Sequence, residues 1–379
     1  MLLNQLETPA LVLDRDALDR NTRRMQARMD GLGVTLRPHV KTAKSIDVLR
    51  RAYPLLPRKI TVSTLREADY FFEHGIRDIL YAVGIAPAKL AHAAQLIRRG
   101  ADLTLILDNL ESATAVAQAA EREQVEFPLL IELDVDGHRS GVTPDNPRLL
   151  ELAQHLSLYP RCRLRGVMTH AGESYNCRSD EALRAMAERE RSGAVYAAER
   201  LRTAGFEAPE VSVGSTPTAT FAESLAGVTE VRAGVYMLQD LVMAGIGVCH
   251  VEDIAVSVLV SVIGHQPDRG WIITDGGWMA LSRDRGTASQ PVDQGFGLIR
   301  DAGGRAPAED LIVLSVNQEH GIVARRDGER PDFSRYPVGS LLRVLPNHAC
   351  ATAAQHGRYE VVAGESAEIL ETWPRINGW

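Results

Sequence analysis

The sequence contains little cysteine, only four residues in a chain of 379. No two of them form a C-x-x-C pair, so neither a disulfide framework nor a C-x-x-C redox or metal motif is expected. This low count suits a reducing compartment, and we expect a cytoplasmic protein. The four cysteines are Cys162, Cys177, Cys249 and Cys350.

The sequence also lacks an excess of positive charge, and its aromatic content is low. The formal net charge is -7, and aromatic residues make up 5% of the chain. A basic surface or a stacking platform for nucleic acid is therefore not expected. No apolar run approaches the ~20 residues of a membrane helix, and the first residues lack the basic and apolar regions of a signal peptide. We expect no nucleic-acid or membrane partner.

Short β-branched runs alternate with helical stretches over the first two thirds of the chain. Such alternation predicts parallel strands joined by helical crossovers, and eight strands over this length suit a (β/α)8 barrel. A doubly wound open sheet is the alternative, although no G-x-G-x-x-G follows the first strand. The eight runs cover residues 36–42, 59–64, 78–83, 102–108, 129–134, 164–170, 210–213 and 230–236.

The pattern changes after residue 247, where strand-like runs are separated by Gly, Pro and Asp turns with few helical stretches. This pattern predicts an antiparallel β domain. We therefore expect a barrel over residues 8–247 and a β domain over residues 248–379. The first strand-like run lies before the barrel helices, so residues 1–14 are expected to join the β domain.

Three candidate catalytic residues follow predicted barrel strands: Lys41, Arg139 and His170. Catalytic side chains of (β/α)8 barrels come from the carboxyl ends of the strands. A lysine in a desolvated barrel mouth can form a Schiff base with a carbonyl compound or with pyridoxal phosphate. For Lys41 the alternative is an exposed loop lysine, as Lys44 is expected to be. For His170 the alternative is a histidine of the barrel interior without a catalytic role.

A candidate phosphate site follows the seventh strand, where Gly214, Ser215 and Thr216 precede a short helical segment. Backbone N–H groups and hydroxyls at such a helix start can bind phosphate. A capped turn is the alternative, since Ser and Thr are common at helix starts. Gly234 closes the eighth strand and would let its backbone approach the same phosphate.

The β domain contains a candidate metal pair, His348 and Cys350. In an extended segment, residues two apart project to the same face. An imidazole and a thiolate at this spacing suit zinc, with positions left open for water or substrate. A chance H-x-C pair is the alternative.

Taken together, these motifs resemble the alanine-racemase-like, fold-type III pyridoxal phosphate enzymes. The resemblance is strongest to the metal-dependent D-serine dehydratase and D-threonine aldolase group, and it covers nearly the whole chain. The motifs that carry it lie at residues 37–42, 136–141, 169–172, 211–218, 228–236, 278–284, 317–321 and 346–350.

The resemblance implies pyridoxal 5'-phosphate as cofactor, covalently bound to Lys41. His170 would stack on the pyridine ring, Arg139 would approach its phenolic oxygen, and Arg232 would face the ring nitrogen. Tyr175 would lie close to the substrate and, with Lys41, would take part in catalysis.

The resemblance also implies a phosphate site and a metal site. The phosphate would be bound by Gly214, Ser215, Thr216, Gly234 and Val235. His348 and Cys350 would bind a divalent metal, with zinc expected first and manganese, cobalt or magnesium as alternatives. Related D-threonine aldolases carry Asp in place of this cysteine, so Cys350 favours a dehydratase.

The function implied is a dehydratase that converts a D-3-hydroxy amino acid to a 2-oxo acid and ammonia. D-threo-3-hydroxyaspartate is the first expected substrate and oxaloacetate its product. Lys41 would remove the α-proton, and the metal would assist loss of the β-hydroxyl. Arg283 and Arg285 are cationic candidates for the second carboxylate.

Other functions remain open at this point. They are D-serine dehydration, aldolase cleavage of the Cα–Cβ bond, amino-acid racemisation, non-catalytic binding of the cofactor and a purely structural barrel. The family resemblance also implies a homodimer.

Overall fold

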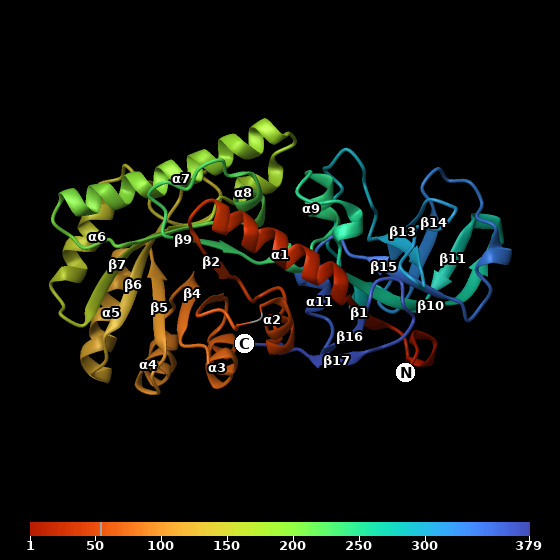
Figure 1. Ribbon diagram of the computed structural model, residues 1–379, viewed down its shortest axis with the longest axis horizontal. Helices are drawn as coiled ribbons and strands as arrows, with labels where there is room; N and C mark the ends of the chain where they lie inside the picture. The colour runs from red at the N-terminus through yellow and green to blue at the C-terminus, as the bar shows by residue number, and fades with distance from the viewer. Residues whose placement is uncertain (54) are drawn as a thin grey trace. The chain divides into compact units, whose positions relative to one another are not determined.

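The computed structural model describes residues 1–53 and 55–379, which form two compact units (Figure 1). We call them the barrel unit and the β unit. The barrel unit consists of Arg24–Lys41, Tyr53–Gly234 and Gly378–Trp379. The β unit consists of Met1–Arg23, Thr42–Ala52 and Val235–Asn377.

The barrel unit contains eight parallel strands in the order β2-β9-β8-β7-β6-β5-β4-β3. The ring closes beyond β2, where His39 bridges to Thr61 and the amide of Val40 donates to the Thr61 carbonyl at 2.9 Å. The predicted (β/α)8 barrel is confirmed. Its strands are β2 (Thr35–Pro38), β3 (Lys59–Val62), β4 (Asp78–Gly84), β5 (Asp102–Leu107), β6 (Phe127–Leu133), β7 (Cys162–Thr169), β8 (Glu210–Val213) and β9 (Glu230–Ala233).

Helices follow the barrel strands and lie outside them (Figure 1). Several begin at a side chain that accepts a hydrogen bond from the first turn, as Asn109 does from the amide of Ser112 at 2.8 Å. Helix α1 (Arg15–Gly31) crosses from the β unit into the barrel unit. The other helices here are α3 (Leu65–Glu73), α4 (Leu90–Arg98), α5 (Leu110–Glu123), α6 (Arg148–Ser157), α7 (Asp180–Thr203) and α8 (Thr216–Phe221).

The β unit is built on a nine-stranded sheet, in which every pair is antiparallel except β1 with β16. The predicted antiparallel β architecture is confirmed. Its strands are β1 (Ala10–Asp14), β10 (Val256–Gln266), β11 (Trp271–Thr274), β12 (Leu298–Asp301), β13 (Leu311–Val316), β14 (Gly321–Arg325), β15 (Leu341–Leu345), β16 (Arg358–Val362) and β17 (Glu371–Pro374). Its helices are α2 (Ile46–Ala52), α9 (Leu241–Gly245), α10 (Trp278–Leu281) and α11 (Ala349–Ala353).

The two units are not separated by a single boundary in the sequence after residue 247. Residues 1–14 pack with the β unit as expected, and residues 15–23, 42–52 and 235–247, which we expected within the barrel domain, pack with it as well. Strand β1 pairs with both β10 and β16, and its Val12 packs against Leu259 in a fully buried cluster. The β unit therefore starts at the N-terminal end of the chain and takes in short segments on both sides of the barrel sequence.

The interior of the barrel contains a buried ion pair between Arg37 on β2 and Glu230 on β9. Arg37 donates from Nε to Glu230 Oε1 at 2.8 Å, and the two side chains are 2% and 1% exposed. A second bond from Arg37 reaches Asp78 at 2.7 Å. Burial opposes the charge on Glu230, but Arg37 and Ser212 lower the pKa of this carboxyl.

This pair is connected to a second buried arginine. The Ser212 hydroxyl donates to Glu230 at 2.7 Å and accepts from Arg232 Nε at 2.9 Å. The hydrogen bonds therefore join strands β2, β8 and β9 inside the barrel. Lys59 on β3 also forms an ion pair with Glu230. Its ammonium lies 3.5 Å from Glu230 Oε2, and its side chain is 37% exposed.

We expect Arg37→Met to lower the free energy of unfolding by about 3–5 kcal/mol, because Glu230 would be left buried without its partner. Urea unfolding followed by circular dichroism measures this change. Lys59→Met is the matched control and should cost at most about 1 kcal/mol, since Lys59 pairs in a more hydrated position. Equal losses in the two variants would contradict the role given to Arg37.

Candidate active site

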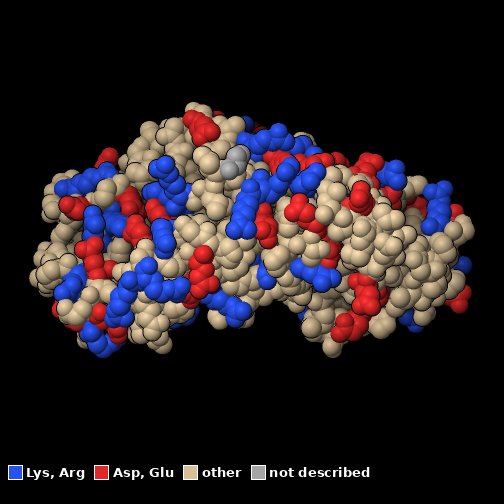
Figure 2. Space-filling model, turned by 60° about the horizontal axis from the view of Figure 1, so that its bottom comes forward, with Lys and Arg blue, Asp and Glu red and all other residues tan. Residues whose placement is uncertain are grey.

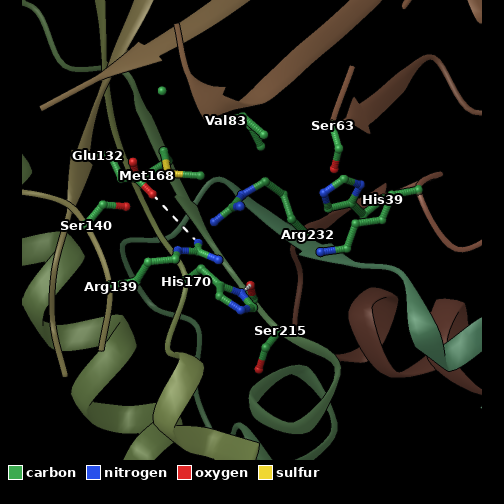
Figure 3. A pocket seen from close by; sticks show the side chains of 14 residues that line it. His39, Ser63, Val83, Glu132, Arg139, Ser140, Met168, His170, Ser215 and Arg232 are labelled. Carbon is green, nitrogen blue, oxygen red and sulfur yellow. Dashed lines mark hydrogen bonds and ion pairs between the residues drawn. The ribbon is translucent and has the colours of Figure 1, made fainter. Parts of the chain in front are cut away.

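The barrel unit contains a cavity of about 390 Å³ at the carboxyl ends of its strands (Figure 3). The labelled side chains come from several different strands and converge on one space (Figure 3). Six residues predicted from the sequence line it: Lys41, Arg139, His170, Gly214, Ser215 and Arg232. The strand-end positions inferred from the sequence are thus brought together in one place.

The remaining predicted residues of the cofactor and substrate sites lie near strand ends but do not line this cavity. Thr216 is the first residue of α8, and Gly234 directly follows β9. Val235 opens the short 3-10 helix Val235–Met237 of the β unit. Tyr175 lies in the 3-10 helix Gly172–Asn176, with its ring centroid 6.3 Å from that of His170.

His170 follows β7 and is held as a neutral imidazole. Its Nδ1 lies 3.0 Å from the carbonyl oxygen of Gly214, to which it donates in the neutral form. Burial lowers the pKa of His170 to about 3, and the cations Lys41, Arg232 and Arg139 act in the same direction. An uncharged flat ring in this position is suited to stacking on an aromatic ligand.

Arg232 contributes a buried cation to the cavity. Its side chain is 4% exposed, and it donates to the Ser212 hydroxyl and to the Thr169 carbonyl. Burial lowers the pKa of Arg232, yet a guanidinium keeps its proton at neutral pH. Arg232 can therefore donate a hydrogen bond to a ligand nitrogen but cannot protonate it.

Gly214 makes a close backbone approach that only glycine permits. Its φ is +134°, and a Cβ there would lie 2.2 Å from the carbonyl oxygen of Arg232. The next residue, Ser215, caps helix α8 by accepting from the amide of Thr218 at 3.2 Å. Gly214 and Ser215 both line the cavity, so a bound phosphate could contact this segment.

Glu190 on α7 positions this segment, and our sequence analysis missed it. Its fully buried carboxylate accepts from the amides of Gly214 at 3.1 Å and Ala171 at 2.9 Å. Burial raises the pKa of Glu190. The helical spacing of Ala187, Glu190 and Ala194 places all three on the buried face, and this periodicity was the signal available in the sequence.

Among the lining residues that were not predicted, Glu132 and His39 are titratable. Glu132 lies on β6, burial raises the pKa of its carboxyl, and Arg139 Nη2 approaches it at 3.9 Å (Figure 3). Burial lowers the pKa of His39 well below its usual value, with Lys41 adding to the effect. The Nδ1 of His39 is buried without a hydrogen-bond partner in the described residues.

These observations fit pyridoxal phosphate. The cavity combines the Lys41 amine, a neutral ring at His170, a fixed cation at Arg232 and the segment Gly214–Ser215 before helix α8. The orphaned Nδ1 of His39 indicates that a polar ligand completes the site, because buried polar atoms are otherwise paired.

The predicted metal pair lies in the β unit. His348 Nδ1 is 2.9 Å from Asp284 Oδ2, and Cys350 Sγ is 3.1 Å from the Thr42 hydroxyl. Burial works against a charged imidazole, but Asp284 and Cys350 raise the pKa of His348 to about 11. Surroundings that favour positive charge, with nitrogen and sulfur donors, fit a divalent cation.

The local structure of the pair differs from our expectation of an extended segment. His348 directly precedes α11 and Cys350 lies in its first turn, because Asp240 accepts from the Ala349 amide at 3.0 Å and helps to start the helix. No group of three or more His, Cys, Asp and Glu side chains suited to a metal occurs within residues 1–53 and 55–379. The pair would therefore leave coordination positions for water or substrate.

The two arginines considered for a second carboxylate differ in their contacts. Arg285 forms an ion pair with Asp293 at 2.6 Å, so its charge is already partnered. The guanidinium of Arg283 lies 5.4 Å from the ring centroid of Trp278. Arg283 is therefore the better of the two candidates.

Comparison with known proteins agrees with this fold. Residues 13–241 match the alanine racemase N-terminal domain, and residues 255–362 match the putative serine dehydratase domain. The class is thus that of alanine-racemase-like proteins carrying a serine dehydratase domain. The chain is 54% identical to D-threo-3-hydroxyaspartate dehydratase of Delftia sp. (strain HT23), over 99% of this chain and 98% of the relative.

Two other similarities extend this result. The D-serine dehydratase of Dictyostelium discoideum is 30% identical over 100% of this chain and 98% of its own length. A cysteine-to-alanine mutant of D-threo-3-hydroxyaspartate dehydratase, solved in the metal-free form, superposes with a TM-score of 0.96 at 53% identity over 100% of both chains. The chain belongs to the family of D-threo-3-hydroxyaspartate and D-serine dehydratases.

We expect Lys41→Arg to abolish covalent attachment of pyridoxal phosphate, because a guanidinium cannot replace the primary amine as a nucleophile. The visible-edge absorbance of the bound cofactor and peptide mass mapping after borohydride reduction measure attachment. Lys44→Arg removes the neighbouring amine and should leave both signals unchanged. A label that remains in the Lys41→Arg protein would contradict the assignment.

Proposed function

We propose that this protein is a pyridoxal phosphate- and divalent metal-dependent dehydratase of D-3-hydroxy amino acids. Its first substrate would be D-threo-3-hydroxyaspartate, converted to oxaloacetate and ammonia. The observation that carries the proposal is the cavity in which Lys41, His170 and Arg232 meet. The family membership and the His348–Cys350 pair support a dehydratase that also needs a metal.

Within this proposal, the residues of the cavity bind and orient the cofactor. Lys41 attaches it, Arg139 approaches its phenolic oxygen, and His170 packs on its ring. The phosphate is bound by Gly214, Ser215, Thr216, Gly234 and Val235. When bound, pyridoxal phosphate supplies the electron-withdrawing ring that makes the substrate's α-proton acidic.

Proton transfer is assigned to Lys41, whose amine takes the α-proton of the substrate. Tyr175, beside His170, lies near the substrate in this arrangement. Because Arg232 cannot give its proton to the ring nitrogen, the ring withdraws electrons only weakly. Help for the leaving hydroxyl is therefore needed.

His348 and Cys350 would hold the metal that gives this help. When bound there, a divalent ion, zinc by the preference of nitrogen and sulfur donors, would supply Lewis-acid assistance to loss of the β-hydroxyl. Asp284 contacts Nδ1 of His348, which leaves Nε2 as the coordinating nitrogen and fixes the ring orientation. Manganese, cobalt and magnesium are alternatives for the ion.

Two related functions are kept as alternatives. D-serine dehydration uses the same steps without a second substrate carboxylate. Aldolase cleavage would need a base on the hydroxyl proton instead of on Cα, and Cys350 favours dehydration over it. A non-catalytic cofactor carrier is the alternative from another class, and the β unit with its metal pair argues against it.

The expected partners are small molecules. No helix in the described part of the chain is long and apolar enough to span a bilayer. On the face seen in Figure 2, basic and acidic side chains are interspersed, a pattern that does not favour nucleic acid. A homodimer is proposed from the family resemblance, and a cytoplasmic location from the low cysteine count.

We expect His348→Ala to reduce 2-oxo acid formation from D-threo-3-hydroxyaspartate by at least about 100-fold, as loss of a metal ligand should. The cofactor absorbance should stay at the wild-type level, since the cavity of the barrel unit is unchanged. His92→Ala is the matched control, because His92 also pairs with a carboxylate, Asp69, at 2.6 Å. Undiminished dehydration in His348→Ala would refute the metal role.

A further inference from the structure

The β unit contains a second cavity of about 390 Å³, and none of its lining residues is shared with the cofactor cavity. Four arginines line it: Arg20, Arg300, Arg305 and Arg343. Three carboxylates, Asp14, Glu252 and Glu365, also line it. Nothing in the proposed dehydratase reaction uses this cavity.

Two of these arginines face each other across adjacent strands. Arg300 on β12 is directly opposite Arg343 on β15 in the antiparallel register. Directly opposed residues share one face of a sheet, where like charges destabilise the pair. In the described part of the chain, no ion pair joins either guanidinium to a carboxylate.

Arg343 is the more deeply buried of the two. Its side chain is 5% exposed, and its Nε donates to the Ser257 hydroxyl at 2.9 Å. Its Nη1 points toward Gly304, where a Cβ would come within 2.9 Å. Burial lowers the pKa of Arg343, with Asp14 and Asp301 opposing the effect from a distance.

Two carboxylates near Arg343 are engaged by other groups. Asp14 Oδ1 accepts from the amides of Asp16 and Gly364, both at 2.9 Å. Asp301 accepts from the amide and the Nε of Arg305, at 2.9 and 3.1 Å. The charges of Glu252, Asp310 and Asp301 act on Arg300 without an ion pair to it. Among the described residues, the buried charge on Arg343 therefore has no direct counterion, which is unfavourable in a protein interior.

We propose that this cavity is a binding site for a small dianionic oxyanion, held by the guanidinium groups of Arg343 and Arg300. Planar guanidinium groups bind phosphate and carboxylate oxygens in pairs, so one dianion could relieve the repulsion between both arginines. Phosphate and dicarboxylate ligands share this chemistry. The site is distinct from the proposed catalytic function.

The test uses the full chain with pyridoxal phosphate bound, so that the cofactor's own phosphate site is filled. Inorganic phosphate and succinate are titrated separately by calorimetry at constant ionic strength, with chloride as the reference anion. We expect at least one of them to bind, and the arm that binds identifies the ligand source. Absence of heat with both probes would overturn the proposal.

Arg300→Gln tests whether the guanidinium of Arg300 binds the anion. Arg300 is changed instead of Arg343 because Arg343 is more deeply buried. We expect the substitution to weaken binding of the active probe by about tenfold or more, the loss of one charged bidentate contact. It should also raise the melting temperature in chloride buffer, because the opposed charges are removed. Arg335→Gln changes an exposed arginine paired with Asp332 and should alter neither value. Unchanged affinity in Arg300→Gln would contradict the site.

Discussion

The buried pair of Arg37 and Glu230 is the constraint on which the barrel and its cavity depend. A buried guanidinium and a buried carboxylate stabilise each other by direct pairing, and removal of either partner leaves the other charge at a high cost. Their bond ties β2 to β9 next to the point where the barrel closes. Ser212 on β8 extends the contact to Arg232, so the interior that stabilises the fold also holds a cation of the cavity.

The chemistry of the cavity follows from the contrast between its charged and uncharged groups. His170 stays neutral through burial and surrounding cations, whereas Arg232 stays charged because arginine keeps its proton. Gly214 and Ser215 line the cavity, and Glu190 accepts a hydrogen bond from the Gly214 amide and so holds this segment in place. A neutral flat ring and a fixed cation are groups that suit the family's cofactor, whereas the proposed metal site lies apart, at His348 and its contact with Asp284.

The barrel and the cavity residues were predictable, because strand alternation fixes the topology and topology brings strand ends together. Lys41, Arg139 and His170 all met this rule, whereas Arg232 was expected only from the family resemblance. Contacts between distant segments were not predictable in the same way. Asp284 reaches His348 across 64 positions of sequence, and no local pattern indicates it. The joining of residues 1–14 to the β domain was expected, whereas the packing of residues 42–52 and 235–247 with the β unit was not, because it depends on contacts between distant segments.

The central claim is metal-assisted dehydration, and product analysis tests it most directly. The full chain with pyridoxal phosphate and zinc is incubated with D-threo-3-hydroxyaspartate, and oxaloacetate, ammonia, glycine and glyoxylate are quantified. We predict oxaloacetate and ammonia in equal amounts, lost on chelation and restored by a divalent metal. Formation of glycine and glyoxylate, or dehydration that a chelator does not affect, would contradict the account.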